Sequence, residues 1–149
     1  SGHVQKLTET LDREVKTEEI YQCLLDTYVV DSEPYRLVDY DLLTGREQDQ
    51  RCVARVAVSE NTLTIDGEGS GPIEAFVTAL GETLNEPVTI LSYQEVAIGA
   101  GSDAQAICIV SIEDREEGQR CYGIGLSRNT TTTAFNAVIS AMNRRWSNS

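Results

Sequence analysis

Residues 67–76 read GEGSGPIEAF, and this stretch decides the fold. A strand-like segment, Leu63 to Asp66, precedes it, and apolar residues at helical spacing follow it: Ile73, Phe76, Val77, Leu80 and Leu84. Pro72 suits the first position of a helix, because the N–H group that it lacks would have no helical partner there. Alternating glycines allow positive φ angles and a close approach of the backbone. The stretch therefore predicts a strand, a glycine-rich connection at 67–72 and a helix.

Two more strands are expected before this stretch. Tyr35 to Leu43 and Arg51 to Val58 have strand-like patterns, and a loop at 44–49 separates them. A tight turn at 59–62 then leads into the third strand. Three antiparallel strands followed by a helix are the simplest arrangement, so residues 35–86 predict one βββα unit.

The second half of the chain repeats this order. Val88 to Ile98, Ala104 to Glu113 and Cys121 to Leu126 are strand-like, with flexible breaks between them. The threonine run at 130–133 leads into an amphipathic helix that ends near Trp146. A second βββα unit is therefore expected.

Sequence echoes between the halves support a duplication. Gly67-x-Gly69 and Gly123-x-Gly125 both follow a third strand, and Ala75-Phe76 and Ala134-Phe135 both open the next helix, at an offset of about 56 to 59 residues. One βββα unit alone would leave a sheet face uncovered. We therefore expect an α+β domain of two βββα units, at 35–86 and 87–146, related by pseudo-twofold symmetry.

A short helical segment is expected before the first strand. Within Val4 to Val30, the apolar positions that recur at helical spacing are Ile20, Cys23, Leu24 and Tyr28. The sequence Ser32-Glu33-Pro34 ends this pattern, because proline disfavours a helical residue before it. Residues 1–3, Ser-Gly-His, resemble the remnant of a cleaved expression tag.

Length and charge exclude several classes of protein. The chain has 149 residues, enough for one domain, and 24 acidic against 12 basic residues give a formal net charge of -12. A field of that sign disfavours nucleic acid and anionic membranes as partners. No apolar run approaches the roughly 20 residues that cross a bilayer. The predicted buried, reduced thiols, which suit a reducing cytosolic compartment, are Cys23, Cys52, Cys108 and Cys121.

The sequence lacks the residues that most catalytic sites need. His3 is the only histidine, so nucleophile–histidine pairs and histidine metal sites are excluded. The acidic runs at 47–49 and 113–117 lie in predicted turns, where such runs are usually solvated. The threonine run at 130–133 has no base beside it and suits a capped helix start. We expect no catalytic residue, metal or cofactor in this chain.

Two stretches are candidates for ligand binding. The connection at 67–72 could present helix N–H groups to a single carboxylate, or it could be a glycine-rich connection without a ligand. The small residues at 99–106 could leave an apolar slot lined by Tyr93, Ala97 and Ala104, with Asp103 available to an ammonium group. The alternative is a mobile hairpin loop.

Three motifs in this order resemble the C-terminal regulatory domain of long-form α-isopropylmalate synthases: residues 67–76, residues 93–106, and Gly123-Ile124-Gly125 with residues 137–144. The resemblance covers about 35–146, and residues 4–34 are similar to the end of the helical linker subdomain. It implies that residues 35–149 form a homodimeric cytoplasmic regulatory domain. This domain would bind L-leucine and inhibit a metal-dependent catalytic barrel, absent from this sequence, that condenses acetyl-CoA with 2-oxoisovalerate in leucine biosynthesis.

The resemblance also implies where leucine binds. The family's pocket corresponds to Gly69, Gly71, Ile73, Glu74, Ile90, Tyr93, Ala97 and Ala104. Helix N–H groups would hold the leucine carboxylate, and burial of its isobutyl group would contribute about 1.5 to 3 kcal/mol. Two alternatives stay open: the similar domain of a citramalate synthase that senses isoleucine, and a dimerisation module without an effector. A self-contained small enzyme is disfavoured by the missing histidines.

Overall fold

The computed structural model describes residues 34–99, 101, 104–115 and 118–147, and it confirms the expected α+β architecture of two βββα units. The expected helix within Val4 to Val30 and residue Asp103 lie outside the described residues. The first unit consists of β1 (Tyr35–Thr44), β2 (Gln50–Val58), β3 (Asn61–Gly69) and α3 (Pro72–Thr83), with a 3-10 turn, η1 (Arg46–Gln48), between its first two strands. The second unit consists of β4 (Ile90–Ile98), β5 (Gln105–Glu113), β6 (Arg120–Ser127) and α4 (Thr130–Ser147).

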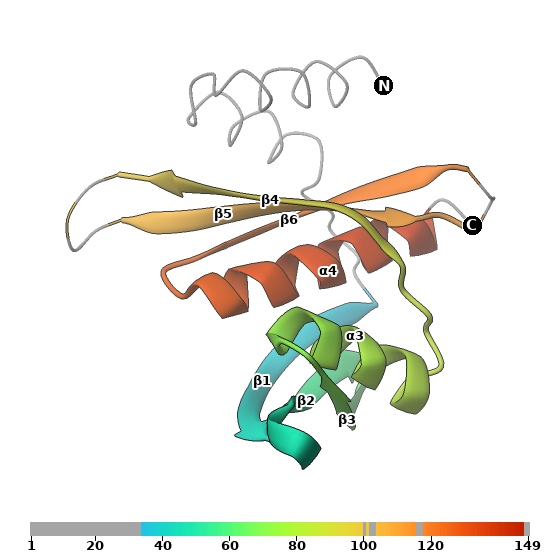
Figure 1. The fold of residues 1–149 in the computed structure, drawn as a ribbon. Coiled ribbons are helices and arrows are strands. Elements are labelled where there is room, and N and C mark those ends of the chain that lie inside the picture. The colour runs from blue at the N-terminus through green and yellow to red at the C-terminus, as the bar shows by residue number, and fades with distance from the viewer. Residues whose placement is uncertain (1–33, 100, 102–103, 116–117, 148–149) are drawn as a thin grey trace.

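Each unit forms its own antiparallel sheet, with β2 central in sheet 1 (β1–β3) and β5 central in sheet 2 (β4–β6). The helices lie between the two sheets (Figure 1): α3 packs on β3 and β2, whereas α4 packs on β6 and β5 and also reaches β1. The two units therefore share one core, in which each helix covers the inner face of its own sheet.

Some predicted boundaries were wrong. Gly67 and Gly69 belong to β3, which runs on to Gly69, so the connection to α3 contains only Ser70 and Gly71. In the second unit, β4 begins at Ile90 rather than at Val88. The threonines at 130–133 lie inside α4 instead of leading into it, and the preceding residue, Asn129, caps the helix.

The strand glycines are required by helix packing. A Cβ atom on Gly67 would lie 2.3 Å from the backbone nitrogen of Ala79, and one on Gly123 would lie 2.3 Å from that of Ala141. Both distances are far below a van der Waals contact, so only glycine lets each helix lie this close to its third strand. The helix residue that meets Gly67 and Gly69 is Ala75, and its counterpart at Gly123 and Gly125 is Ala137. The packing repeat therefore aligns Ala75 with Ala137 and not with the Ala134 of the sequence echo.

Aromatic and polar contacts join the two units. Phe76 of α3 stacks on Phe135 of α4 with ring centroids 4.2 Å apart, and Tyr40 of β1 packs on the same Phe135 ring. The backbone N–H of Tyr35 donates to the side-chain oxygen of Asn143, and the side-chain amide of Asn143 donates back to the Tyr35 carbonyl. Both groups are buried, so this reciprocal pair satisfies polar groups that would otherwise destabilise the core.

Candidate functional site

A small hollow lies where the first turns of both helices meet β4. Its volume is about 110 Å³, and its lining residues are Pro72, Ile73, Tyr93, Glu95, Thr130, Thr131 and Ala134. Pockets for drug-sized ligands start at roughly 300 Å³. The hollow therefore suits a small molecule and is too small for a nucleotide.

The hollow exists because the two units do not close on each other equally. β1 of the first unit packs against α4, whereas β4 makes at most sparse contact with α3. Tyr93 and Glu95 pair across the ladder with Val110 and Cys108, so they lie on the helix-facing side of sheet 2. Tyr93 is nevertheless 43% exposed and Glu95 is also exposed. The helix-facing side of β4 is therefore accessible near the first turn of α3.

The beginning of α3 offers hydrogen-bond donors to this hollow. Gly71 is the N-cap residue and makes no side-chain capping bond, and the backbone N–H of Ala75 is the first that bonds within the helix, to the Gly71 carbonyl at 3.0 Å. The N–H groups of Ile73 and Glu74 precede it in the first turn, where the helix dipole places partial positive charge. This end of α3 can therefore accept a carboxylate group.

The beginning of α4 is built differently. The side-chain oxygen of Asn129 accepts a hydrogen bond from the Thr132 N–H at 3.0 Å, and the Tyr40 hydroxyl lies 2.6 Å from the Thr132 hydroxyl. The Asn129 side chain therefore caps the first turn of α4 from within the protein, unlike the start of α3. The second helix therefore contributes the side chains of Thr130, Thr131 and Ala134 to the wall of the hollow rather than an open turn.

A carboxylate completes the hollow on the side of β4. The Tyr93 hydroxyl donates to Glu95 Oε2 at 2.8 Å, and burial together with this hydrogen bond raises the pKa of Tyr93 above its usual value. Burial also raises the pKa of the neighbouring Cys108 thiol to about 12, so Cys108 stays neutral. Glu95 thus adds a carboxylate to the lining of a hollow that Ile73, in the first turn of α3, also lines.

The structure brings only part of the predicted site to this hollow. Ile73 and Tyr93 both line it, and Gly71 caps the helix beside it. The Glu74 side chain is not among the lining residues and accepts a hydrogen bond from the Ser70 hydroxyl. Gly69 is buried against α3, which makes it a packing residue in this structure.

The remaining predicted residues lie along β4 and β5, away from the lining of the hollow. Ile90 packs against the core at the other end of β4. Ala97 is exposed farther along β4, on the same side as Tyr93, and Ala104 precedes β5. None of these three residues lines the hollow.

The predicted site residues did not include five of the residues that line the hollow, which are Pro72, Glu95, Thr130, Thr131 and Ala134. Glu95 could have been found, because it lies two positions after Tyr93 and strand residues two apart share a face. The residues of α4 carried no such signal, since they reach the hollow only when the second unit folds against the first.

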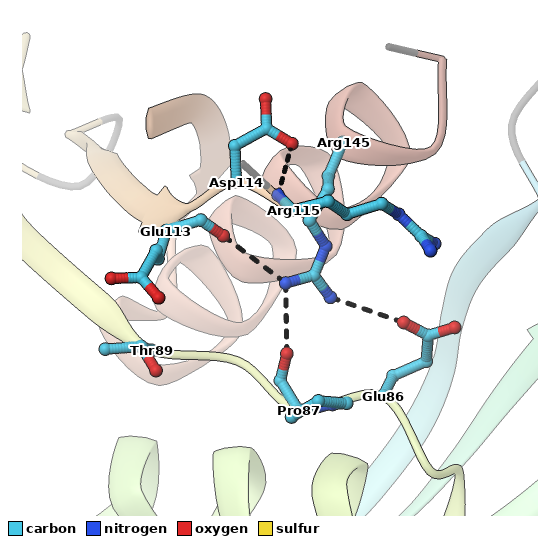
Figure 2. Close-up of a pocket in the computed structure, with 7 residues that line it drawn as sticks. All are labelled: Glu86, Pro87, Thr89, Glu113, Asp114, Arg115 and Arg145. Carbon is cyan, nitrogen blue, oxygen red and sulfur yellow. Dashed lines mark hydrogen bonds and ion pairs between the residues drawn. The ribbon is translucent and has the colours of Figure 1, made fainter. Parts of the chain in front are cut away.

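A second hollow, of about 230 Å³, lies at the opposite end of α4 (Figure 2). Arg145 projects into it from α4 and donates to the carbonyl oxygens of Pro87 and Glu113, at 3.0 and 3.4 Å, and to the Glu86 carboxylate at 3.3 Å. The Tyr35 hydroxyl donates to the other oxygen of Glu86, and burial followed by this bond raises the pKa of Tyr35 to about 12. Arg145 therefore holds the connection between the two units in place. The residues around this hollow have a structural role.

Three further observations on the described residues concern metal binding, cysteine chemistry and membrane insertion. No cluster of three or more histidine, cysteine, aspartate or glutamate residues in that part is arranged to hold a metal ion. Cys52, Cys108 and Cys121 are buried, as predicted, while Cys23 lies outside the described part. No helix in the described ranges is long and apolar enough to cross a membrane.

Comparison with known proteins identifies relatives over most of the chain. A family model described as the LeuA allosteric (dimerisation) domain matches residues 14–146. The chain is 35% identical over 147 residues to 2-isopropylmalate synthase of Pseudomonas fluorescens and 30% identical over 146 residues to that of Clostridium acetobutylicum, with 95% of the chain covered in both cases. It spans about a quarter of the length of these relatives, 25% and 26% respectively.

Proposed function

Because the chain belongs to the LeuA allosteric (dimerisation) domain family, the regulatory domain of 2-isopropylmalate synthases, we propose that it binds L-leucine as a feedback inhibitor. The observation that carries this proposal is the hollow between the first turns of α3 and α4. It combines donors at one helix start, a carboxylate at Glu95 and apolar surface at Ile73 and Tyr93. A small amino acid has the charges and the apolar tail that match these three groups.

In the proposed complex, the leucine carboxylate accepts hydrogen bonds from the N–H groups of Ile73 and Glu74. Its ammonium group pairs with Glu95, whose other contact is the Tyr93 hydroxyl. The isobutyl group packs on Ile73, Tyr93 and Ala134, and its burial contributes about 1.5 to 3 kcal/mol. One methylene changes such binding by about 1 to 3 kcal/mol, so leucine is favoured over valine.

The parent protein follows from the same proposal. The chain itself is non-catalytic, and it would be joined to the catalytic barrel of a cytoplasmic acyltransferase that condenses acetyl-CoA with 2-oxoisovalerate. Two copies would form a homodimer, as the description of the family indicates. Leucine inhibits such an enzyme if it binds the inactive state more tightly, and a coupling free energy of about 1 to 3 kcal/mol is typical.

Titration calorimetry of the chain with leucine, isoleucine and valine tests this proposal. Leucine should give the tightest binding. Tightest binding of isoleucine would indicate the regulatory domain of a citramalate synthase, and no heat from any of the three, with the dimer intact, would indicate a dimerisation module without an effector. Either outcome contradicts the leucine proposal.

Variants locate the binding site. Glu95→Gln should weaken leucine binding about tenfold, because it removes a charge-assisted hydrogen bond to the ammonium group. Glu82→Gln, on an exposed position of the same domain, is the matched control and should leave the affinity unchanged. Ala97→Phe tests the part of the slot that the sequence predicts beyond the hollow. If Glu95→Gln binds leucine normally and Ala97→Phe does not, the ligand lies farther along β4.

A further inference from the structure

The outer face of sheet 2, on the side away from α4, carries a group of aliphatic residues beside the polar Ser92, Gln94 and Ser111. In the register of the sheet, Val96 pairs with Ile107 and Ile107 with Leu126, while Ile109 pairs with Ile124. Paired residues share a face of a sheet. The residues of this aliphatic face are therefore Val96, Ile107, Ile109, Ile124 and Leu126.

No described element covers the aliphatic face. The alternate residues of β5, Cys108, Val110 and Ile112, belong to the core cluster between the sheets. Among the described elements, β5 packs extensively only on β4, β6 and α4, all of which lie beside it or on the core side. Yet Ile107 is 0% and Ile109 5% exposed. Aliphatic side chains contribute about 1.5 to 3 kcal/mol each when buried, so covering this face stabilises the domain considerably.

We propose that residues 14–30 of the same chain cover the aliphatic face as an amphipathic helix. The match to the family covers residues 14–146, so this segment is part of the unit that the family model describes. Its apolar positions, Ile20, Cys23, Leu24 and Tyr28, recur at the spacing of one helix face. The aliphatic face and this stripe are complementary surfaces.

Length and attachment agree with this occupant. A helix of residues 14–30 extends about 25 Å, and the 9 residues of β5 extend about 30 Å, so one helix spans the sheet along its strands. The described chain begins at Pro34, and the reciprocal hydrogen bonds with Asn143 fix the next residue, Tyr35, to α4, the helix directly beneath sheet 2. The segment therefore enters next to the sheet that it would cover.

Charge at one edge favours the same arrangement. Ser111 lies on the outer face of β5, since it pairs with Ser92 and Tyr122, and Arg120 donates to its hydroxyl. This places a guanidinium group at the border of the aliphatic face. The segment carries Glu18 and Glu19, which can pair with such a cation at the rim.

Cross-linking within one chain tests the proposal. Cys23 is a natural thiol in the apolar stripe, and Leu126→Cys adds one on the aliphatic face. A short bismaleimide should link Cys23 to the new thiol in the same chain, as mass spectrometry on mixed isotope-labelled and unlabelled protein shows. Thr64→Cys, on the outer face of sheet 1, is the control and should not be linked. Links only between copies would show that a second copy covers the face, and equal linking of both variants would show no specific docking; each result overturns the proposal.

A second pair of variants tests whether the apolar stripe is what brings Cys23 to the added thiol. In the Leu126→Cys background, Leu24→Asp places a charge in the apolar stripe and should abolish the cross-link, whereas Gln22→Asp, on the opposite side of the helix, should keep it. Leucine binding by both variants is measured in a separate titration, because the hollow at α3 lies on the other side of sheet 2 from the proposed helix. Persistence of the cross-link in the Leu24→Asp variant would overturn the proposal even if leucine binds.

Discussion

The two βββα units are alike inside and different outside. In both, a pair of glycines on the third strand lets an alanine-lined helix lie against the sheet. The outer face of sheet 1, however, carries the ion pairs Arg51–Asp66 and Arg55–Asp39, while the outer face of sheet 2 carries the group of aliphatic residues. Packing constrains the helix–sheet contact of both units, because a side chain there would collide with backbone. The outer faces of the two sheets are not constrained by such a contact, and their residues differ.

The ion pairs of sheet 1 mark it as the solvated side of the molecule. Each arginine is bound through two nitrogens, and hydrogen bonds from these arginines hold the pKa values of Asp39 and Asp66 below their usual range. All four side chains are between 44% and 53% exposed, so these pairs contribute little to stability. Sheet 1 thus needs no cover, in contrast to sheet 2.

The largest expected effect tests this contrast between the outer faces. Ile109→Ala on the central strand of sheet 2 should lower the free energy of unfolding by about 2 to 5 kcal/mol, the usual cost of emptying a buried site. Val53→Ala, on the outer face of the central strand of sheet 1, should cost clearly less because Val53 is only partly buried. Urea denaturation measures both. Equal losses would remove the distinction between a covered and a solvated sheet.

The next effect tests the shared interior. Gly67→Ala and Gly123→Ala should each lower the free energy of unfolding by about 1 to 3 kcal/mol, since the new Cβ meets helix backbone in both units. Gly81→Ala, in α3 with open space around it, should instead raise stability by about 0.5 to 1 kcal/mol. A large loss at one strand glycine alone would show that the duplicated packing is not equivalent.

A smaller effect separates the two helix starts. Asn129→Ala removes the cap of α4 and should lower the free energy of unfolding by about 1 kcal/mol. Gly71→Ser adds a capping side chain to α3, where the backbone is already extended, and should raise stability by a few tenths of a kcal/mol. The same serine would satisfy donors that the proposed leucine carboxylate needs, so calorimetry should show weaker binding. Unchanged leucine affinity in Gly71→Ser would separate the open helix start from ligand binding.

The smallest effect appears only at alkaline pH. It concerns the connection between the two units, where the Tyr35 hydroxyl donates to Glu86. The pKa of Tyr35 is raised from 10.0 to about 12, first by burial and then by its hydrogen bond to Glu86, so its contribution to stability is full below pH 10 and is lost as the pH rises toward 12. Tyr35→Phe should therefore lose less stability than the unmodified chain over this interval, measured by urea denaturation at successive pH values. Parallel alkaline losses in the two proteins would contradict this role of Tyr35.

The sequence determined the order of the elements and the duplication. Strand-like segments, the helical spacing after Pro72 and the repeated Gly-x-Gly motifs are local signals, and the structure confirms two βββα units from them. It also pointed to Tyr93, as a residue that could line a slot left by the small residues at 99–106, and the family resemblance pointed to Ile73. The features that could be predicted are therefore those that depend on local patterns, namely the backbone freedom of glycine and the spacing of apolar residues.

Tertiary structure alone decided the rest. It assigned Gly69 to packing, because only the position of α3 shows that a Cβ there would touch Ala75. It brought Thr130 and Ala134 close to Ile73. It also left the β4 side of the hollow open, whereas β1, in the other unit, packs against α4. These facts depend on how one unit rests on the other. Contacts between residues distant in the chain follow from shape and volume, which no local pattern in the sequence records.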